Sequence, residues 1–318
     1  MKFRRPNTSS VLQGLAWSLT FAALDAAQAA VFGNWLQSLD SFQIGFLVFA
    51  LTTTVALAWI ALRNPAQLRL AFANPGLLLG INGGFALGWA MFLLSVQRIE
   101  PAISFALFTG SIPLAMLFGG LACPQGRRDT GNFAEFCGKL VLLAGMVMLA
   151  GTTLAGQSGF VRDDRGAAAI GLLMSVGAGV SIAGMLVFSN RLDRTGVTPL
   201  TQFGTRFGLY LVLALAGWYL AMDAKPQEPQ LATLVAAIAL GIVLMAFPVF
   251  AVQKAVALVS PATIAAFAAT SPFFVFIFQL FEGRVDYSPM TLAGLVVCFT
   301  GSIITVIGTS IRESLKGA

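Results

Sequence analysis

The sequence predicts an all-α membrane protein with ten transmembrane helices, arranged as two inverted five-helix repeats. Composition, ten apolar segments and a recurring set of residues lead to this prediction. The chain has 318 residues, of which 57% are hydrophobic and only 10% are charged, whereas roughly a quarter of the residues of a soluble domain are charged. A membrane span needs about 20 apolar residues, so this length leaves room for about ten spans and little else.

Apolar runs bounded by charged residues, proline and glycine locate the predicted spans. They are expected near residues 11–32, 42–62, 75–97, 101–122, 139–156, 167–190, 199–222, 231–256, 260–281 and 291–311. Pro113, Pro248 and Pro272 lie inside three of these spans. Each proline removes a backbone hydrogen bond, so a kink is expected at each position.

The distribution of basic residues predicts the orientation of the spans. Thirteen of the 19 lysine and arginine residues fall on the side of both termini, five fall on the other side, and Arg206 falls within a span. This bias agrees with the positive-inside rule. Both termini are therefore expected in the cytoplasm. Compactness and the absence of sorting extensions favour the cytoplasmic (inner) membrane of a bacterial-type cell.

An internal repeat divides the chain into two similar halves. Four groups of residues recur in the same order at an offset of 156 to 160 positions. The groups are Gly14 with Gly171; Val31, Phe32, Asn34 and Leu36 with Val187, Phe188, Asn190 and Leu192; Pro101, Ala102, Ala106 and Ser111 with Pro261, Ala262, Ala266 and Ser271; and Gly138 and Gly145 with Gly294 and Gly301. We expect repeats over residues 1–156 and 167–318, joined by a linker over residues 157–166 that contains Arg162 and Asp163. Five helices per repeat give the second repeat the opposite orientation, as in many secondary transporters.

Asp25 is the first candidate for a functional site, because it is an acid well inside the first apolar span. An ionisable group at that depth costs ~2.5–3.5 kcal/mol on insertion scales, so it is expected to face water, a partner or a substrate. Trp17, Phe21 and Gln28 lie at helical spacing from Asp25 and share its face. The carboxylate could pair with an amine or take up a proton. The alternative is a polar contact between helices in a closed core.

The third span carries a glycine at every fourth position, which predicts the close approach of another helix. These glycines are Gly76, Gly80, Gly84 and Gly88. Asn82, Phe85 and Trp89 lie roughly opposite the glycines and are expected to face a cavity. For the two aromatic residues, filling of the core is the alternative.

Hydroxyl-bearing residues lie beside helix-internal prolines at equivalent positions of the two repeats. Thr109 and Ser111 lie in the fourth span, and Thr270 and Ser271 lie in the ninth. Their hydroxyls and the carbonyls freed by proline could meet near the membrane midplane. Alternatively, the hydroxyls satisfy the backbone of their own helices.

Arg206 and Lys254 are the basic residues closest to predicted spans. Snorkelling of these long side chains to the lipid headgroups is the ordinary explanation of such positions. If the two side chains face a cavity instead, they would favour an anionic substrate such as a sugar phosphate.

Several short motifs resemble those of the EamA-type branch of the drug/metabolite transporter superfamily. They are Leu258-Val259-Ser260-Pro261, Ser271-Pro272, Leu280-Phe281-Glu282-Gly283, the glycines Gly294, Gly301 and Gly308, and Thr198-Pro199 followed by Arg206. The first half departs from the pattern, with Phe49 near the arginine position and Leu121-Ala122 in place of the terminal glutamate. The resemblance covers about residues 11–311. It implies a carrier of small metabolites, often an exporter, whose central cavity is lined by the first, third, fourth, sixth, eighth and ninth helices.

The expected function is a secondary transporter, by resemblance an exporter, that moves a small amphiphilic or amine-bearing metabolite by alternating access. Proton coupling through Asp25 is an additional hypothesis. An exchanger of phosphorylated or nucleotide-linked metabolites is the alternative. The expected partners are a small-molecule substrate and the lipid bilayer, and no nucleic acid is expected because the basic residues form no continuous patch.

An enzyme is not expected, because the chain has no histidine and no pair of carboxylates at one depth. A channel would not require the duplication. Neither a cofactor nor a metal is expected, because zinc sites draw on histidine and on closely spaced cysteines. The three cysteines, Cys123, Cys137 and Cys298, form no CxxC motif.

Overall fold

The computed structural model of the chain is all-helical, as the sequence predicts. It describes residues 8–122, 132–160, 164–226, 229–256, 258–259 and 261–316, and over these residues it contains no β-strand. Cys123, Arg162, Asp163 and Ser260, which are named above, lie outside the described residues.

Thirteen α-helices follow one another along the described chain. They are α1 (Thr8–Trp35), α2 (Ser41–Arg63), α3 (Pro65–Phe72), α4 (Pro75–Arg98), α5 (Pro101–Ala122), α6 (Phe133–Leu154), α7 (Arg165–Asp193), α8 (Pro199–Thr205), α9 (Gly208–Tyr219), α10 (Leu231–Val256), α11 (Pro261–Ala268), α12 (Ser271–Phe281) and α13 (Pro289–Lys316). The short helix α3, which begins at a proline, was not predicted. It joins the two longer helices α2 and α4.

The helices are those of a multi-pass membrane protein. In the described residues, seven helical stretches are long and apolar enough to cross a membrane, judged by length and composition. They are Leu12–Trp35, Ser41–Arg63, Pro75–Arg98, Phe133–Leu154, Arg165–Asp193, Thr263–Phe281 and Pro289–Arg312. Pro101–Leu117 and Leu231–Leu244 are shorter apolar helices. Most predicted spans coincide with one helix, whereas residues 199–222 and 260–281 each divide into two helices, α8 with α9 and α11 with α12.

The first of these two spans is broken between α8 and α9 by a side chain from α4. The Asn82 amide nitrogen donates to the carbonyl of Thr205 (2.9 Å), and the Asn82 amide oxygen accepts from the backbone N–H of Leu209 (3.1 Å). In a continuous helix these two backbone groups would bond to each other. The amide of Asn82 therefore replaces one helical hydrogen bond, and it satisfies both backbone groups at the break.

The second broken span separates α11 from α12 at a proline. Pro272 is in the first turn of α12, and because it has no N–H it cannot donate to the carbonyl of Ala268 four residues earlier, as a continuous helix would require. The hydroxyl of Thr270 donates to the carbonyl of Phe267 (2.6 Å) and closes the turn at the break. By contrast, Pro113 and Pro248 lie inside the continuous helices α5 and α10.

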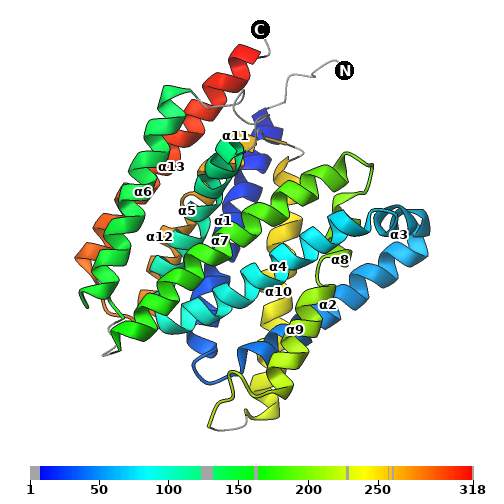
Figure 1. The fold of residues 1–318 in the computed structure, drawn as a ribbon, viewed down its shortest axis with the longest axis horizontal. Coiled ribbons are helices and arrows are strands. Elements are labelled where there is room, and N and C mark those ends of the chain that lie inside the picture. The colour runs from blue at the N-terminus through cyan, green and yellow to red at the C-terminus, as the bar shows by residue number, and fades with distance from the viewer. Residues whose placement is uncertain are drawn as a thin grey trace.

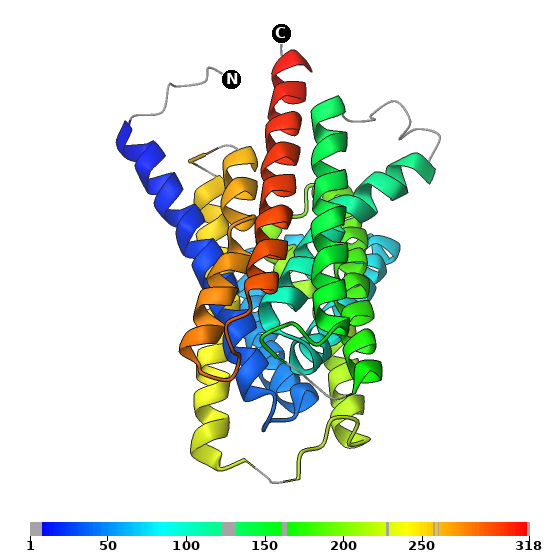
Figure 2. The same ribbon diagram turned by 90° about the vertical axis from the view of Figure 1, so that its left-hand side faces the viewer.

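The helices form a bundle in which partners from distant parts of the sequence lie side by side (Figure 1). Helix α4 packs along α7, α1 packs along α10, and α6 packs along α13. Helix α5 also packs on α7, and α12 packs on α1. Figure 2 shows the start of α1 and the end of α13 at the same end of the bundle, which we call the termini end. The connection between α9 and α10 lies at the other end, which we call the opposite end.

The predicted close approach at the glycines of α4 is confirmed at three of the four positions. A Cβ atom at Gly80, Gly84 or Gly88 would lie within 2.9 Å of atoms of α7. At Gly84 it would meet the carbonyl oxygen of Ser181 at 2.7 Å and the Cβ of Met185 at 2.8 Å. A Cβ at Gly76 would meet nothing within 4 Å. Three glycines therefore let the backbones of α4 and α7 approach each other closely.

Replacing Gly84 by alanine is expected to lower the stability of the protein, because the new methyl group would push α4 away from α7. Overpacking of this kind costs about 1–3 kcal/mol. The matched control is Gly83→Ala in the same helix, where an added Cβ meets nothing within 4 Å. Thermal unfolding in detergent, followed by tryptophan fluorescence, should show a lower Tm for Gly84→Ala only. Equal Tm values for the two variants would contradict the prediction.

Candidate functional site

A cavity of about 600 Å³ lies between α1, α5, α11, α12 and α13, and we call it the Asp25 cavity. Its volume is in the range of sites that bind small molecules. Most of its wall is apolar, with side chains such as Phe21, Ile112 and Leu295. The break between α11 and α12 contributes Ala269 and Pro272 to the wall. The Asp25 cavity is therefore built around a discontinuous helix.

Asp25 is the one charged residue among the described residues that line this cavity. Hydroxyl groups from Thr109 of α5 and from Ser302, Thr305 and Thr309 of α13 also line it. The three threonine hydroxyls donate to carbonyls of their own helices at 2.8–3.0 Å. Their oxygen atoms thus remain able to accept a hydrogen bond from a bound molecule.

The carboxylate of Asp25 has no hydrogen bond and no ion pair within the part of the chain that the structure describes. A carboxylate in an apolar environment is costly unless it gains a partner or a proton. The cavity beside Asp25 offers space for such a partner. The geometry is therefore suited to binding a cationic group or a proton at this carboxylate.

The face of α1 predicted to bear the site divides between the cavity and the packed core. Phe21 lines the cavity next to Asp25. Gln28 is buried, Trp17 is half-buried, and neither is among the residues that line the cavity. Asp25 and Phe21 thus share the wall of the Asp25 cavity, whereas Trp17 and Gln28 lie outside that wall.

The hydroxyl residues near the prolines also divide between two roles. Thr109 lines the Asp25 cavity, whereas Ser111, Thr270 and Ser271 are not among its lining residues. Ser111 and Thr270 donate to carbonyls of their own chain segments, at 2.7 and 2.6 Å. Ser271 instead donates to the carbonyl of Ala22 in α1 at 3.2 Å. This bond fastens the start of α12 to α1, one turn away from Asp25.

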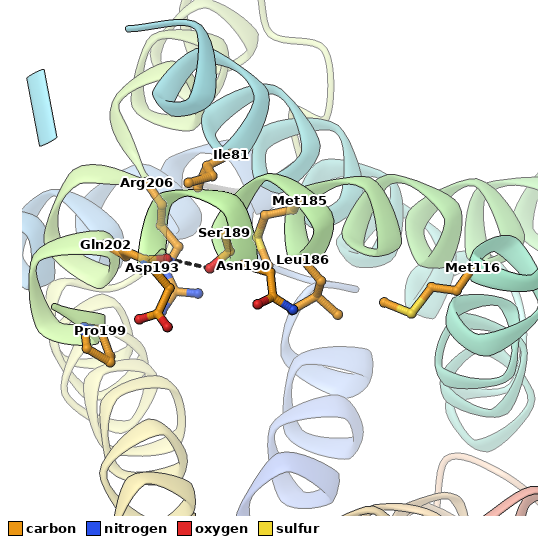
Figure 3. Close-up of a pocket in the computed structure, with 10 residues that line it drawn as sticks. All are labelled: Ile81, Met116, Met185, Leu186, Ser189, Asn190, Asp193, Pro199, Gln202 and Arg206. Carbon is orange, nitrogen blue, oxygen red and sulfur yellow. Dashed lines mark hydrogen bonds between the residues drawn. The ribbon is translucent and has the colours of Figure 1, made fainter. Parts of the chain in front are cut away.

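A second cavity, of about 490 Å³, lies beside the break between α8 and α9, and we call it the Arg206 cavity. Its lining residues are Ile81, Met116, Met185, Leu186, Ser189, Asn190, Asp193, Pro199, Gln202 and Arg206. Figure 3 shows Ser189, Asn190 and Asp193 of α7 close to Gln202 and Arg206. Ser189 donates to the amide oxygen of Gln202 at 2.5 Å. This wall is more polar than that of the Asp25 cavity.

The guanidinium group of Arg206 is held by aromatic rings. Its central carbon lies 4.8 Å from the ring centre of Phe203, 5.4 Å from that of Phe207 and 6.0 Å from that of Phe85. Its Nε atom is buried without a hydrogen-bond partner among the described residues. Aromatic faces attract a cation but do not neutralise it. Arg206 thus keeps a positive charge at the wall of the cavity.

The predicted residues of α4 are part of the packing around Arg206. Phe85 and Trp89 stack with ring centres 5.7 Å apart, and both pack edge-on against Phe49. Neither they nor Asn82, which occupies the helix break, line the two cavities. Lys254 is exposed near the end of α10 and does not line either cavity.

The two cavities adjoin each other, because Leu186 of α7 lines both. Both reach toward the termini end of the bundle. Thr309 lies in the last two turns of α13, and Asp193 is the last residue of α7. Asp25 and Arg206 therefore lie on the walls of two adjoining cavities that share Leu186 of α7.

Sequence reasoning missed several lining residues. Ser302, Thr305 and Thr309 recur at spacings of three and four along an apolar helix, so they share one face. This pattern could have identified them. The resemblance implied walls from the first, third, fourth, sixth, eighth and ninth helices. The described wall of the Asp25 cavity also includes α13 and Leu142 of α6, and it includes no residue of α4 or α10.

Comparisons with known proteins agree with this architecture. Residues 169–307 match the model of the EamA-like transporter family, which is part of the drug/metabolite transporter superfamily. The predicted resemblance is thereby confirmed over this part of the chain. A solved structure titled "Crystal structure of protein" is similar over 95% of this chain and 97% of that chain, with a TM-score of 0.58 and 18% identity, which shows the fold alone. No match was found among curated proteins.

Proposed function

We propose that this EamA-type membrane transporter exports a small amphiphilic or amine-bearing metabolite by alternating access, with Asp25 as the residue that binds the substrate or a coupling proton. One observation carries the proposal. Asp25 is the charged residue on the described wall of a largely apolar cavity of about 600 Å³. An apolar wall with one carboxylate is complementary to an apolar molecule that bears a cationic group.

Recurring contacts support the proposed duplication over residues 1–156 and 167–318. In three pairs of contacts, a glycine of one half meets a side chain of the other half, and the reverse contact occurs at the equivalent positions, 156 to 160 residues away. The contacts are Gly14 with Val259 and Gly171 with Ile99, Gly145 with Cys298 and Gly301 with Leu142, and Gly138 with Thr305 and Gly294 with Leu149. Such reciprocity is expected when two copies of one fold pack about a pseudo-twofold axis.

The directions of equivalent helices support an inverted arrangement. Helix α1 begins at the termini end, whereas its proposed counterpart α7 ends there (Figure 2). Helices α6 and α13, the proposed last helices of the two halves, likewise run in opposite directions. If the two halves exchange conformations, the Asp25 and Arg206 cavities would close at the termini end and the bundle would open at the opposite end. This exchange is the physical basis of the proposed alternating access.

The charge distribution supports a cytoplasmic termini end in the inner membrane. Arg191 lies in the last turn of α7 and Arg194 follows it, at the end of α7 that faces the termini end, and Arg63 and Arg69 lie in the last turns of α2 and α3. Basic residues are retained on the cytoplasmic side of a membrane. The Asp25 and Arg206 cavities would then be accessible from the cytoplasm, which is the side from which an exporter loads its substrate.

The Arg206 cavity supports a second candidate, an exchanger of phosphorylated or nucleotide-linked metabolites. Arg206 faces the cavity with no acidic side chain within ion-pair distance among the described residues. A guanidinium group binds phosphate well, because its planar donors match two phosphate oxygens. The carboxylate of Asp193 on the same wall would repel an anion. We therefore place this function second.

Replacing Asp25 by asparagine tests the leading proposal. The change keeps the shape of the side chain and removes its charge. A hydrogen bond to a charged group contributes about 1.5–3 kcal/mol, so binding of a cationic amphiphile such as ethidium is expected to weaken about tenfold or more. Binding and efflux would be measured with the reconstituted protein at two pH values. Asp286→Asn, which removes an exposed carboxylate outside both cavities, is the control and should leave both unchanged. Unchanged efflux and pH dependence in Asp25→Asn would contradict the role of Asp25.

Competition between ligands separates the two candidate functions. The leading proposal predicts that a cationic amphiphile displaces bound ethidium and that glycerol phosphate does not. The second candidate predicts binding of glycerol phosphate to the wild type, loss of that binding in Arg206→Gln, and weaker binding in Arg206→Lys, because lysine keeps the charge but lacks the planar donors. Isothermal titration of the purified protein with each compound would measure these affinities.

A further inference from the structure

The opposite end of the bundle is closed around a buried acid that neither cavity contains. Glu100 lies between α4 and α5, and none of its surface is exposed. In the described residues, no lysine or arginine is within ion-pair distance of it. A buried carboxylate without a cation is costly unless hydrogen-bond donors surround it. Glu100 therefore depends on the neutral groups around it.

Three donors from three different segments reach this carboxylate. The Gln279 amide of α12 donates to Oε1 at 2.5 Å. The Thr291 hydroxyl of α13 and the backbone N–H of Gly159 donate to Oε2, both at 2.9 Å. The amide oxygen of Gln279 also accepts from the backbone N–H of Ala102 at 3.0 Å, so this side chain contacts both Glu100 and the first turn of α5. The acid thus joins the start of α5 to two helices of the second half and to the segment between the halves.

The connecting segment is fastened to the same region by further bonds. The backbone N–H of Asp286 donates to the carbonyl of Gly159 at 2.9 Å. The hydroxyl of Ser288 donates to the carbonyl of Gln157 at 2.6 Å. These bonds hold the segment between the halves against the start of α13. Glu100 is at the centre of a cluster that would have to separate if the two halves moved apart at this end.

Burial raises the pKa of Glu100, and the hydrogen bonds from Gln279, Thr291 and Gly159 lower it. The three donors therefore offset part of the cost of the buried charge only while they remain in place. Once they separate, water must replace them. The structure shows the arrangement in which protein donors satisfy the acid, and an open arrangement would need water in their place.

We infer that Glu100 locks the opposite end of the transporter, and that this lock opens once in each transport cycle. The opening of the lock in a transport cycle rests on the proposed function. That the Glu100 cluster holds the two halves together at the opposite end does not. Substitution by glutamine is expected to weaken the lock. One carboxylate oxygen becomes an NH2 group, which would face either the amide donor of Gln279 or the N–H of Gly159.

The test measures the separation of the two halves at the opposite end. Spin labels would be attached at Ser38, after α1, and at Met290, at the start of α13, in a cysteine-free chain reconstituted in lipid nanodiscs. Both positions are exposed. Electron–electron resonance should show mainly one short distance in the unmutated chain. Glu100→Gln is expected to raise the ratio of a longer-distance population to the short one at least tenfold. Thr291→Val, which removes one donor, should shift the ratio less and in the same direction.

Controls separate this inference from unfolding and from the proposed function. Asp286→Asn, an exposed carboxylate in the same region, should leave the distances unchanged because its side chain takes no part in the cluster. If Glu100→Gln does not fold, Thr291→Val still decides the question. Folded variants with unchanged distances would overturn the lock even if Asp25 proves essential for transport. A shifted distance in a protein that transports nothing would retain the lock and refute the proposed function.

Discussion

A carboxylate inside a membrane protein requires donors, water or a bound molecule around it, and two acids meet this requirement at different depths of the bundle. Glu100 is surrounded by protein donors and has no exposed surface. Asp25 has no such donors within the described chain, and a cavity lies beside it instead. One acid therefore closes the opposite end, and the other is left for water or a ligand. The closed packing around Glu100 and the cavity beside Asp25 therefore differ because protein donors surround only Glu100.

The proposed halves share their packing but differ where chemistry is expected. Glycine contacts recur at equivalent positions of both halves. In contrast, the first half has Phe49 at the position equivalent to Arg206 of the second half. Both side chains contact the ring of Phe207. Continuous helices in the first half correspond to broken helices in the second, at Asn82's insertion and at Pro272. Both breaks adjoin cavities, as in transporters whose sites lie at discontinuous helices.

The sequence predicted what depends on local composition. Apolar runs located most of the long helices, and the glycine spacing of α4 identified a face that another helix approaches, because both signals recur in consecutive turns of one helix. Asn82 was expected to face a cavity, but it occupies a helix break instead. Its partners there lie more than 120 positions away in α8 and α9, so this role could not be read from the sequence. The same reason hid Glu100, whose donors are 59, 179 and 191 positions distant.

The central claim is that Asp25 faces an aqueous cavity reached from the termini end, and chemical labelling tests it most directly. In a cysteine-free chain, Asp25→Cys and Leu19→Cys would be treated with a membrane-impermeant thiol reagent in oriented vesicles. Leu19 is an exposed residue of the same helix and does not line the cavity. Cys at position 25 is expected to be labelled rapidly when the termini end faces the reagent, and Cys at position 19 is expected to be labelled little. Equal labelling at both positions, or none at position 25 from either side, would contradict the claim.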